Sequence, residues 1–170
     1  MTHGRDDGFV YGNLEDKANL RNPIARRLVQ GFDTALQELL DRCEPRSLHE
    51  VGAGEGRLTT LMVSWHEVPV RASELSPELA RRGGELGLPR TEFLCRSVYD
   101  LTTAEDHADT VVCCEVLEHL DDPERGVRAL AALGARQYVL SVPREPLWRA
   151  LNLARGKYVA ALGNTPGHLN

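Results

Sequence analysis

Short apolar runs alternate with helix-like segments five times along this 170-residue chain, and this alternation constrains the fold more than any other feature. Each run is short enough for a buried strand, and the intervening segments repeat their apolar residues at helical spacing. Parallel strands need long crossovers, which helices usually supply, and such sheets are covered on both faces. We therefore predict a doubly wound α/β fold with a mostly parallel sheet. The predicted strands span residues 47–51, 68–72, 91–95, 108–114 and 137–142.

Three helix starts are marked by a capping residue followed by proline, the favoured first residue of a helix. They are Asn22-Pro23, Ser76-Pro77 and Asp122-Pro123. The first of these helices repeats its apolar residues at helical spacing from Ile24 through Leu28 to Leu40, and Glu44-Pro45 is expected to end it. This spacing gives the helix one apolar face.

Chemically distinctive residues follow four of the predicted strands. Gly52–Gly56 follows the first strand, Glu74 the second, Arg96–Asp100 the third and Glu115 the fourth. In open sheets of this kind, ligands bind beyond the carboxyl ends of the strands. A carboxylate at position 74 can accept both hydroxyls of a ribose, so the set predicts a nucleotide site at this edge.

The glycine cluster alone is a weak signal. A dinucleotide-binding loop has the spacing G-x-G-x-x-G, which requires a third glycine where this chain has Arg57. The observed spacing is G-x-G-x-G, with Glu50 just upstream. Taken by itself, a tight turn without a ligand explains the glycines equally well.

Taken together, the motifs resemble those of class I S-adenosylmethionine-dependent methyltransferases, with similarity over roughly residues 20–145. EVGAGEG matches the first motif, ASELSPELA the second, FLCRSVYDL the adenine-side motif, DTVVCCEVLEHLDDP the fourth, and YVLSVP the fifth strand. The resemblance implies a Rossmann-like sheet and S-adenosyl-L-methionine as cofactor. Ser97 stands where many members carry aspartate.

The resemblance also implies a role for each matching residue. The glycines would lie against the methionine part of the cofactor, Glu50 would orient the loop and the amino group, and Glu74 would hold the ribose. Ser97 and Val98 would border the adenine, and Glu115 would line the pocket. The full cofactor-binding set is Glu50, Gly52, Ala53, Gly54, Gly56, Glu74, Leu75, Ser97, Val98 and Glu115.

The chemistry explains why few catalytic residues are expected. A sulfonium methyl group is already activated and its leaving group is neutral, so the protein mainly has to position the reactants in line. A hydroxyl acceptor would also need a base, for which His119 is the nearest candidate in the sequence. A structural role for His119 remains the alternative.

A metal site is a second interpretation of the segment after the fourth strand. If this segment is helical, Glu115, Glu118 and His119 lie at i, i+3 and i+4 on one face and could ligate a divalent metal ion. The resemblance to ubiquinone-pathway O-methyltransferases and small-RNA 2′-O-methyltransferases implies such a cluster. In the small-RNA enzymes a further histidine follows the fifth strand, and His168 would be its counterpart here. The opposing interpretation, which we favour, is a metal-free helix start in which Glu118 complements the helix dipole.

The length of the chain suggests a single domain. We expect a flexible leader at residues 1–21 and a methyltransferase domain at 22–170, with its cofactor-binding core at about 45–143. We expect residues 144–170 to form an incomplete C-terminal part, because their pattern does not predict the final strands usual in this class.

The charge and composition of the chain limit the kinds of partner that we expect. The formal net charge of −5 gives no general reason to expect nucleic acid or anionic lipid, and no run approaches membrane-spanning length. The four cysteines lack the paired spacing of a zinc site and suit reduced thiols in a cytoplasmic protein. We therefore expect methyl transfer to a small-molecule acceptor. The alternatives are a metal-assisted RNA 2′-O-methyltransferase and a non-catalytic cofactor-binding module.

Overall fold

A computed structural model describes residues 5–6, 9–10 and 23–143 of the chain. Five parallel strands form one sheet in the order β5-β4-β3-β6-β7. The chain first adds β4 and β5 on one side of β3 and then adds β6 and β7 on the other side. The strand order therefore reverses between β3 and β6. The strands are β3 (Leu48–Val51), β4 (Val70–Glu74), β5 (Thr91–Cys95), β6 (Thr110–Cys114) and β7 (Gln137–Ser141).

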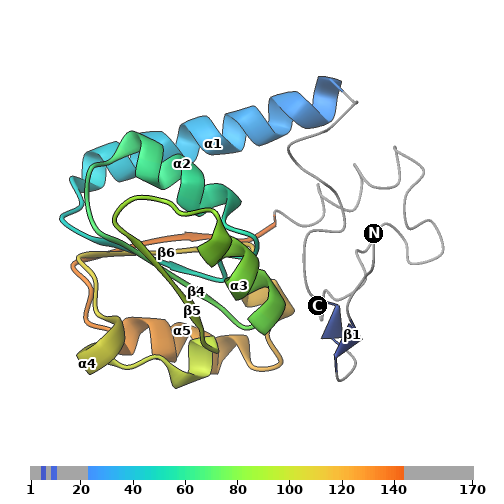
Figure 1. Cartoon of the computed structure of the whole chain (residues 1–170), viewed down its shortest axis with the longest axis vertical. Helices are drawn as coiled ribbons and strands as arrows, with labels where there is room; N and C mark the ends of the chain where they lie inside the picture. Colours follow the sequence, from blue (N-terminus) through green and yellow to red (C-terminus); the bar gives the residue numbers. More distant parts are fainter. Residues whose placement is uncertain (1–4, 7–8, 11–22, 144–170) are drawn as a thin grey trace.

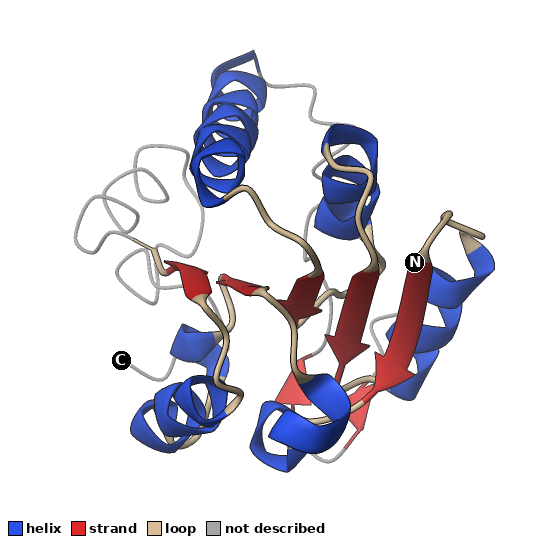
Figure 2. Cartoon of the chain, turned by 90° about the vertical axis from the view of Figure 1, so that its left-hand side faces the viewer, coloured by secondary structure: helices blue, strands red, loops and turns tan. Residues whose placement is uncertain are grey.

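Helices cover both faces of this sheet, which confirms the predicted doubly wound α/β architecture (Figures 1 and 2). Figure 1 shows α1 and α2 on one side of the sheet and α4 and α5 on the other. The helices are α1 (Pro23–Cys43), α2 (Arg57–Trp65), α3 (Pro77–Glu85), α4 (Thr103–Asp106) and α5 (Pro123–Ala132), with single 3₁₀ turns at η1 (Val98–Asp100) and η2 (Leu117–His119).

The prolines mark helix starts as predicted. Pro77 and Pro123 open α3 and α5, and the preceding side chains cap these helices. Asp122 Oδ1 accepts a hydrogen bond from the Arg125 N–H at 2.8 Å, which satisfies one of the unpaired donors of the first turn. Pro23 is likewise the first residue of α1, while Asn22 lies outside the described residues.

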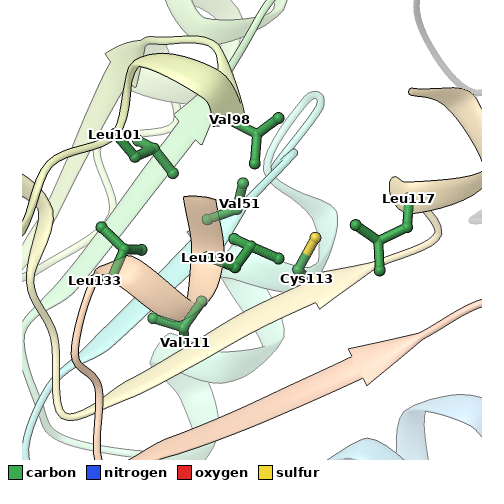
Figure 3. Close-up of a cluster of buried hydrophobic side chains, with 8 residues drawn as sticks. All are labelled: Val51, Val98, Leu101, Val111, Cys113, Leu117, Leu130 and Leu133. Carbon is green, nitrogen blue, oxygen red and sulfur yellow. The ribbon is translucent and has the colours of Figure 1, made fainter. Parts of the chain in front are cut away.

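Two apolar clusters fill the layers on either side of the sheet. Figure 3 shows the cluster between the sheet and α5, which comprises Val51, Val98, Leu101, Val111, Cys113, Leu117, Leu130 and Leu133. The second cluster lies under α1 and α2 and comprises Leu36, Leu40, Leu48, Met62, Val70, Val112 and Val139. Neighbouring residues of β6, such as Val111 and Val112, therefore serve opposite layers, as the alternation of side chains along a strand requires.

α1 is longer than the strands it covers. Its 21 residues span about 31 Å, against about 17 Å for a five-residue strand. The helix ends beside the start of β3, so its N-terminal half extends past the carboxyl edge of the sheet (Figure 1). Leu28, a residue of the predicted apolar face, is 49% exposed for this reason.

A buried histidine joins the centre of the sheet to α4. His49 lies in β3 with no exposed surface, and its ring contacts Ser73 Oγ at 3.0 Å and the Asp106 carbonyl oxygen at 2.8 Å. Burial lowers the pKa of His49, because a buried imidazolium would lose its hydration. The neutral ring therefore fixes the position of Ser73 at the carboxyl end of β4.

β1 (Arg5–Asp6) and β2 (Phe9–Val10) form a separate antiparallel pair within the segment predicted as a leader. The predicted absence of C-terminal strands concerns residues 144–170, which lie outside the described residues. In the part of the chain that is described, no helix has both the length and the apolar character needed to cross a membrane.

Candidate functional site

The fold brings the predicted site residues to one edge of the sheet. Gly52–Gly56, Glu74, Ser97 and Glu115 each follow a strand at its carboxyl end, and the strands lie side by side. The segments also touch one another there. The Gly54 N–H donates to Glu74 Oε2 at 2.8 Å, so the loop after β3 and the end of β4 form a single structural unit.

The glycine loop has a backbone that other residues adopt only with strain. Gly52, Gly54 and Gly56 have φ angles of 82°, 56° and 83°, all in the left-handed region. The N–H groups of Gly52 and Ala53 both donate to the Ser73 carbonyl oxygen, at 2.8 and 3.0 Å. The loop therefore turns back over β4 and is held there by the backbone.

The three glycines differ in what surrounds them. A Cβ atom at Gly52 would lie 2.3 Å from Val116 Cγ2, and one at Gly56 would lie 2.8 Å from the ring of Phe93. A Cβ atom at Gly54 would meet nothing within 4 Å. Gly52 and Gly56 are thus required by close packing within the protein, whereas Gly54 faces open space that a ligand can enter.

Glu74 is buried, with 8% of its surface exposed, and each of its carboxylate oxygens accepts one hydrogen bond. Oε2 accepts from Gly54 N–H, and Oε1 accepts from Ser76 N–H at 2.9 Å. Each carboxylate oxygen has two lone pairs, so both oxygens keep the capacity to accept one more hydrogen bond. The two backbone bonds orient the carboxylate while leaving it able to receive a pair of hydroxyl donors.

Glu50 is the most strongly perturbed carboxyl group at this edge. It is buried beneath the loop, where burial raises its pKa to about 7, with a smaller contribution from the charge of Glu74. A hydrogen bond from the Thr59 hydroxyl to Glu50 Oε2 acts in the opposite direction, as does the charge of Arg57. This carboxyl group therefore changes its protonation state close to neutral pH.

An ion pair that the sequence analysis missed connects α1 to the loop. Arg57 Nη2, at the first residue of α2, lies 2.5 Å from Asp33 Oδ2 in α1. Asp33 Oδ1 is also buried. Helical spacing alone gave no sign of this contact, because it joins residues from separate elements. It fixes the part of α1 that extends over the carboxyl edge.

The segment after β5 forms another wall. Ser97 Oγ accepts from the Tyr99 N–H at 3.2 Å and caps η1, and Val98 is buried in the core beneath. Tyr99 in turn exchanges hydrogen bonds with the backbone of Asp122, and the Arg125 guanidinium lies 4.4 Å from its ring centroid. Leu75, next to Glu74, is 50% exposed and offers an apolar surface at the same edge.

The segment after β6 departs from its predicted conformation. Glu115 has φ 58°, a left-handed backbone, and only the single 3₁₀ turn η2 follows it. The expected α-helical face shared by Glu115, Glu118 and His119 therefore does not form. Ser141 Oγ, at the end of β7, donates instead to Glu115 Oε1 at 2.9 Å.

Among residues 23–143 and the two short strands, no group of three or more His, Cys, Asp or Glu side chains is placed to hold a metal ion. His119 is exposed, and the carboxylate oxygens of Glu118 are turned away from solvent. His168, the further predicted ligand, lies outside the described residues. The metal interpretation remains a prediction.

A cavity of about 450 Å³ lies at the opposite edge of the sheet and contains none of the predicted site residues. Its polar lining includes Arg71, which is already held by Glu92 at 3.1 Å. The predicted site residues lie instead at the carboxyl ends of the strands, where open sheets of this kind bind ligands, so the candidate site is placed there.

Comparison with known proteins shows the family of this chain. Residues 49–135 match the model of a family described as a methyltransferase domain. The chain belongs to this family. The matched region begins within β3 and ends before β7, so it contains the glycine loop, Glu74 and Glu115.

Two curated relatives in this family are ubiquinone biosynthesis O-methyltransferases. The protein of Xanthomonas axonopodis pv. citri (strain 306) is 31% identical over 177 residues, covering 95% of this chain and 73% of the relative. That of Xanthomonas euvesicatoria pv. vesicatoria (strain 85-10) is 33% identical over 121 residues, covering 66% of this chain and 50% of the relative. This second match spans only half of the relative.

The fold is also similar to solved methyltransferase structures. The plantazolicin methyltransferase BpumL, solved in complex with SAH, superposes with a TM-score of 0.56 at 13% identity. The similarity covers 79% of this chain and 58% of BpumL. At this identity the likeness shows a shared fold, and the roles of individual residues cannot be transferred from it.

Proposed function

We propose that this chain is the cofactor-binding core of an S-adenosylmethionine-dependent methyltransferase that acts on a hydroxyl group of a small molecule. The hydrogen bond between Gly54 N–H and Glu74 Oε2 supports this most directly. It places a carboxylate with spare acceptor capacity beside a glycine whose exposed side is open. A nucleoside with two adjacent ribose hydroxyls and a charged tail suits that pair.

The remaining residues suit the other parts of the cofactor. Glu50, below the loop, can carry the negative charge that attracts an ammonium group. Leu75 supplies exposed apolar surface, and Ser97 supplies a polar group for the edge of a base. The cofactor would thus be held by Glu74, Gly54 and Glu50, with Leu75 and Ser97 near the adenine.

When bound, S-adenosylmethionine supplies a methyl group on a positively charged sulfur, whose thioether leaving group is neutral. The residues of the chain then have to align the acceptor and exclude competing water. A hydroxyl acceptor must also lose its proton, and His119, exposed in η2 just after β6, is our candidate base.

The proposed acceptor class has two supports. The curated relatives are named as O-methyltransferases, which favours an oxygen acceptor. In addition, burial raises the pKa of Cys114 to about 11, with smaller contributions from the nearby carboxylates of Glu50, Glu115 and Glu118. Such a concentration of carboxylates disfavours a polyanionic acceptor such as RNA.

Calorimetric titration with S-adenosylhomocysteine tests the cofactor assignment, and we expect saturable binding at one site per chain. Transfer of a labelled methyl group from S-adenosylmethionine should then be measured with a panel of catechols and with short RNA. Absence of S-adenosylhomocysteine binding would contradict the proposed function. Labelling of RNA but not of any catechol would contradict the acceptor class.

A further inference from the structure

The sheet order determines which part of the site faces the acceptor, if the proposed function holds. Ser97 follows β5, Glu74 ends β4 and Gly54 follows β3, and these three strands are neighbours in that order. The adenine, ribose and methionine parts of the cofactor would therefore lie one after another along the carboxyl edge. The next strands along this edge are β6 and β7, so the reacting end of the cofactor lies toward them.

Glu115 follows β6 at this end, and its carboxylate contacts Ser141 of β7. Its left-handed backbone, with φ 58°, turns the chain sharply after β6. Its N–H donates to the Ser141 carbonyl oxygen at 3.0 Å, and its Oε1 accepts from Ser141 Oγ at 2.9 Å. β7, which carries Ser141, lies on the side of β6 opposite to β3.

We propose that Ser141 is a positioning residue that holds the Glu115 carboxylate at the reacting end of the cofactor, facing the acceptor. This inference rests on the proposed function and deepens it. Glu115 would then be an acceptor-side group, rather than the cofactor wall that the sequence resemblance implies. A carboxylate there selects acceptors that present an O–H, an N–H or a cationic group.

The two bonds from Ser141 give the arrangement its rigidity. A glutamate side chain alone has three rotatable bonds and would lose its orientation easily. The hydroxyl of Ser141 fixes one carboxylate oxygen, and the backbone bond fixes the turn from which the side chain leaves. Removal of the Ser141 hydroxyl should therefore keep the negative charge of Glu115 but no longer fix the orientation of its carboxylate.

A pair of ligands can test this without knowledge of the acceptor. Sinefungin carries a protonated amine where S-adenosylmethionine carries its methylsulfonium group, whereas S-adenosylhomocysteine has neither charge nor substituent there. Both should bind through Glu74 and Gly54, so the ratio of their dissociation constants reports on groups that face the methyl position. We expect the wild-type chain to bind sinefungin more tightly.

The variants are Glu115→Gln, Ser141→Ala and Ser141→Thr, with Ser64→Ala as a control, because Ser64 is an exposed serine of α2. We expect Glu115→Gln to reduce the preference for sinefungin by about tenfold or more, with S-adenosylhomocysteine affinity unchanged within about twofold. Ser141→Ala should reduce the preference by about threefold or more. Ser141→Thr and Ser64→Ala should retain it.

Two results would overturn the inference. An unchanged preference in Glu115→Gln would show that the carboxylate does not face the methyl position. Equal weakening of both ligands would show that Glu115 is a general wall of the cofactor pocket. Glu115→Gln keeps an acceptor for Ser141, so the test stands even if Ser141→Ala does not fold. If the wild-type chain fails to bind S-adenosylhomocysteine, the proposed function itself is wrong.

Discussion

Gly83 in α3 packs so closely on Phe93 in β5 that a Cβ atom at position 83 would lie 2.2 Å from the aromatic ring. The same ring would lie 2.8 Å from a Cβ atom at Gly56. The Phe93 ring thus packs closely against both a helix glycine and the last glycine of the loop. The packing of α3 and the position of the loop depend on one another through this side chain.

Gly83→Ala should therefore destabilise the protein, by about 1–3 kcal/mol, because the added methyl group overpacks the Phe93 contact. Gly84→Ala is the matched control in the same helix, since its nearest neighbour would be 3.9 Å away. Higher helix propensity should make that variant more stable, by about 0.5–1 kcal/mol. Urea unfolding of both variants checks the pair, and a shift of the same sign in both would contradict the packing argument.

Gly54→Val should abolish or strongly weaken S-adenosylhomocysteine binding, because its side chain would fill the space that opens over the loop. We expect affinity to fall by at least about tenfold. The φ of 56° adds a strain of about 1–2 kcal/mol, which by itself would also lower stability.

Gly134→Val separates strain from blockage. Gly134 has φ 66°, also meets nothing within 4 Å, and lies before β7 at the opposite edge of the sheet. Gly134→Val should lose about as much stability as Gly54→Val. Its affinity for S-adenosylhomocysteine, measured by calorimetry, should be unchanged. If both variants bind equally well, or equally badly at matched stability, Gly54 does not face the cofactor.

Glu74→Ala should weaken S-adenosylhomocysteine binding by about 10- to 100-fold, because a buried, charged acceptor of hydroxyl groups is lost. The loop also loses its bond to Gly54 N–H, so circular dichroism should accompany the titration. Glu78→Ala is the control, as its carboxylate makes only exposed ion pairs with Arg81 and Arg82. Unchanged affinity in Glu74→Ala would disprove the ribose assignment.

The raised pKa of Glu50 predicts a specific pH dependence. Its pKa is about 7 in the folded protein and near 4.5 when unfolded, so the folded state binds the proton more tightly. The favourable contribution is complete below about pH 4.5 and is lost as the pH rises through 7. The amplitude is on the order of 3 kcal/mol.

Glu50→Gln removes this titration. The difference in unfolding free energy between Glu50→Gln and wild type should grow in favour of the variant between pH 5 and 8. This difference is the correct measurement, because the lowered pKa of His49 acts on both proteins and has the opposite sign. A constant difference across that range would contradict the raised pKa.

Much of the fold followed from local patterns. Residues 91–95 form β5 as predicted, the prolines at 77 and 123 open helices, and the strand ends carry the expected residues to one edge. These features depend on hydrophobic alternation and on capping, which act over a few residues. The neighbours of each strand were harder to derive, since they depend on contacts between distant segments.

The parts that were not predicted depend on such distant contacts. The segment from Glu115 to His119 contains good helix-forming residues, yet the backbone of Glu115 is left-handed. This is because β7 supplies a hydrogen bond to Glu115 that an isolated helix would lack. Asp33 and Arg57 are 24 positions apart, and Ser141 meets Glu115 from 26 positions away. No periodicity in the chain records these pairs.

The strand order also predicts that the two ends of the candidate site differ in local stability. Within the described sheet, β3 and β4 have neighbours on both sides, whereas β7 has only β6. Amide hydrogens near Glu74 should therefore exchange with solvent much more slowly than those near Ser141. If the acceptor binds on the β7 side, as proposed, substitutions there can accumulate without loosening the β3–β4 side. The methyl acceptor could then change while the methyl donor stays the same.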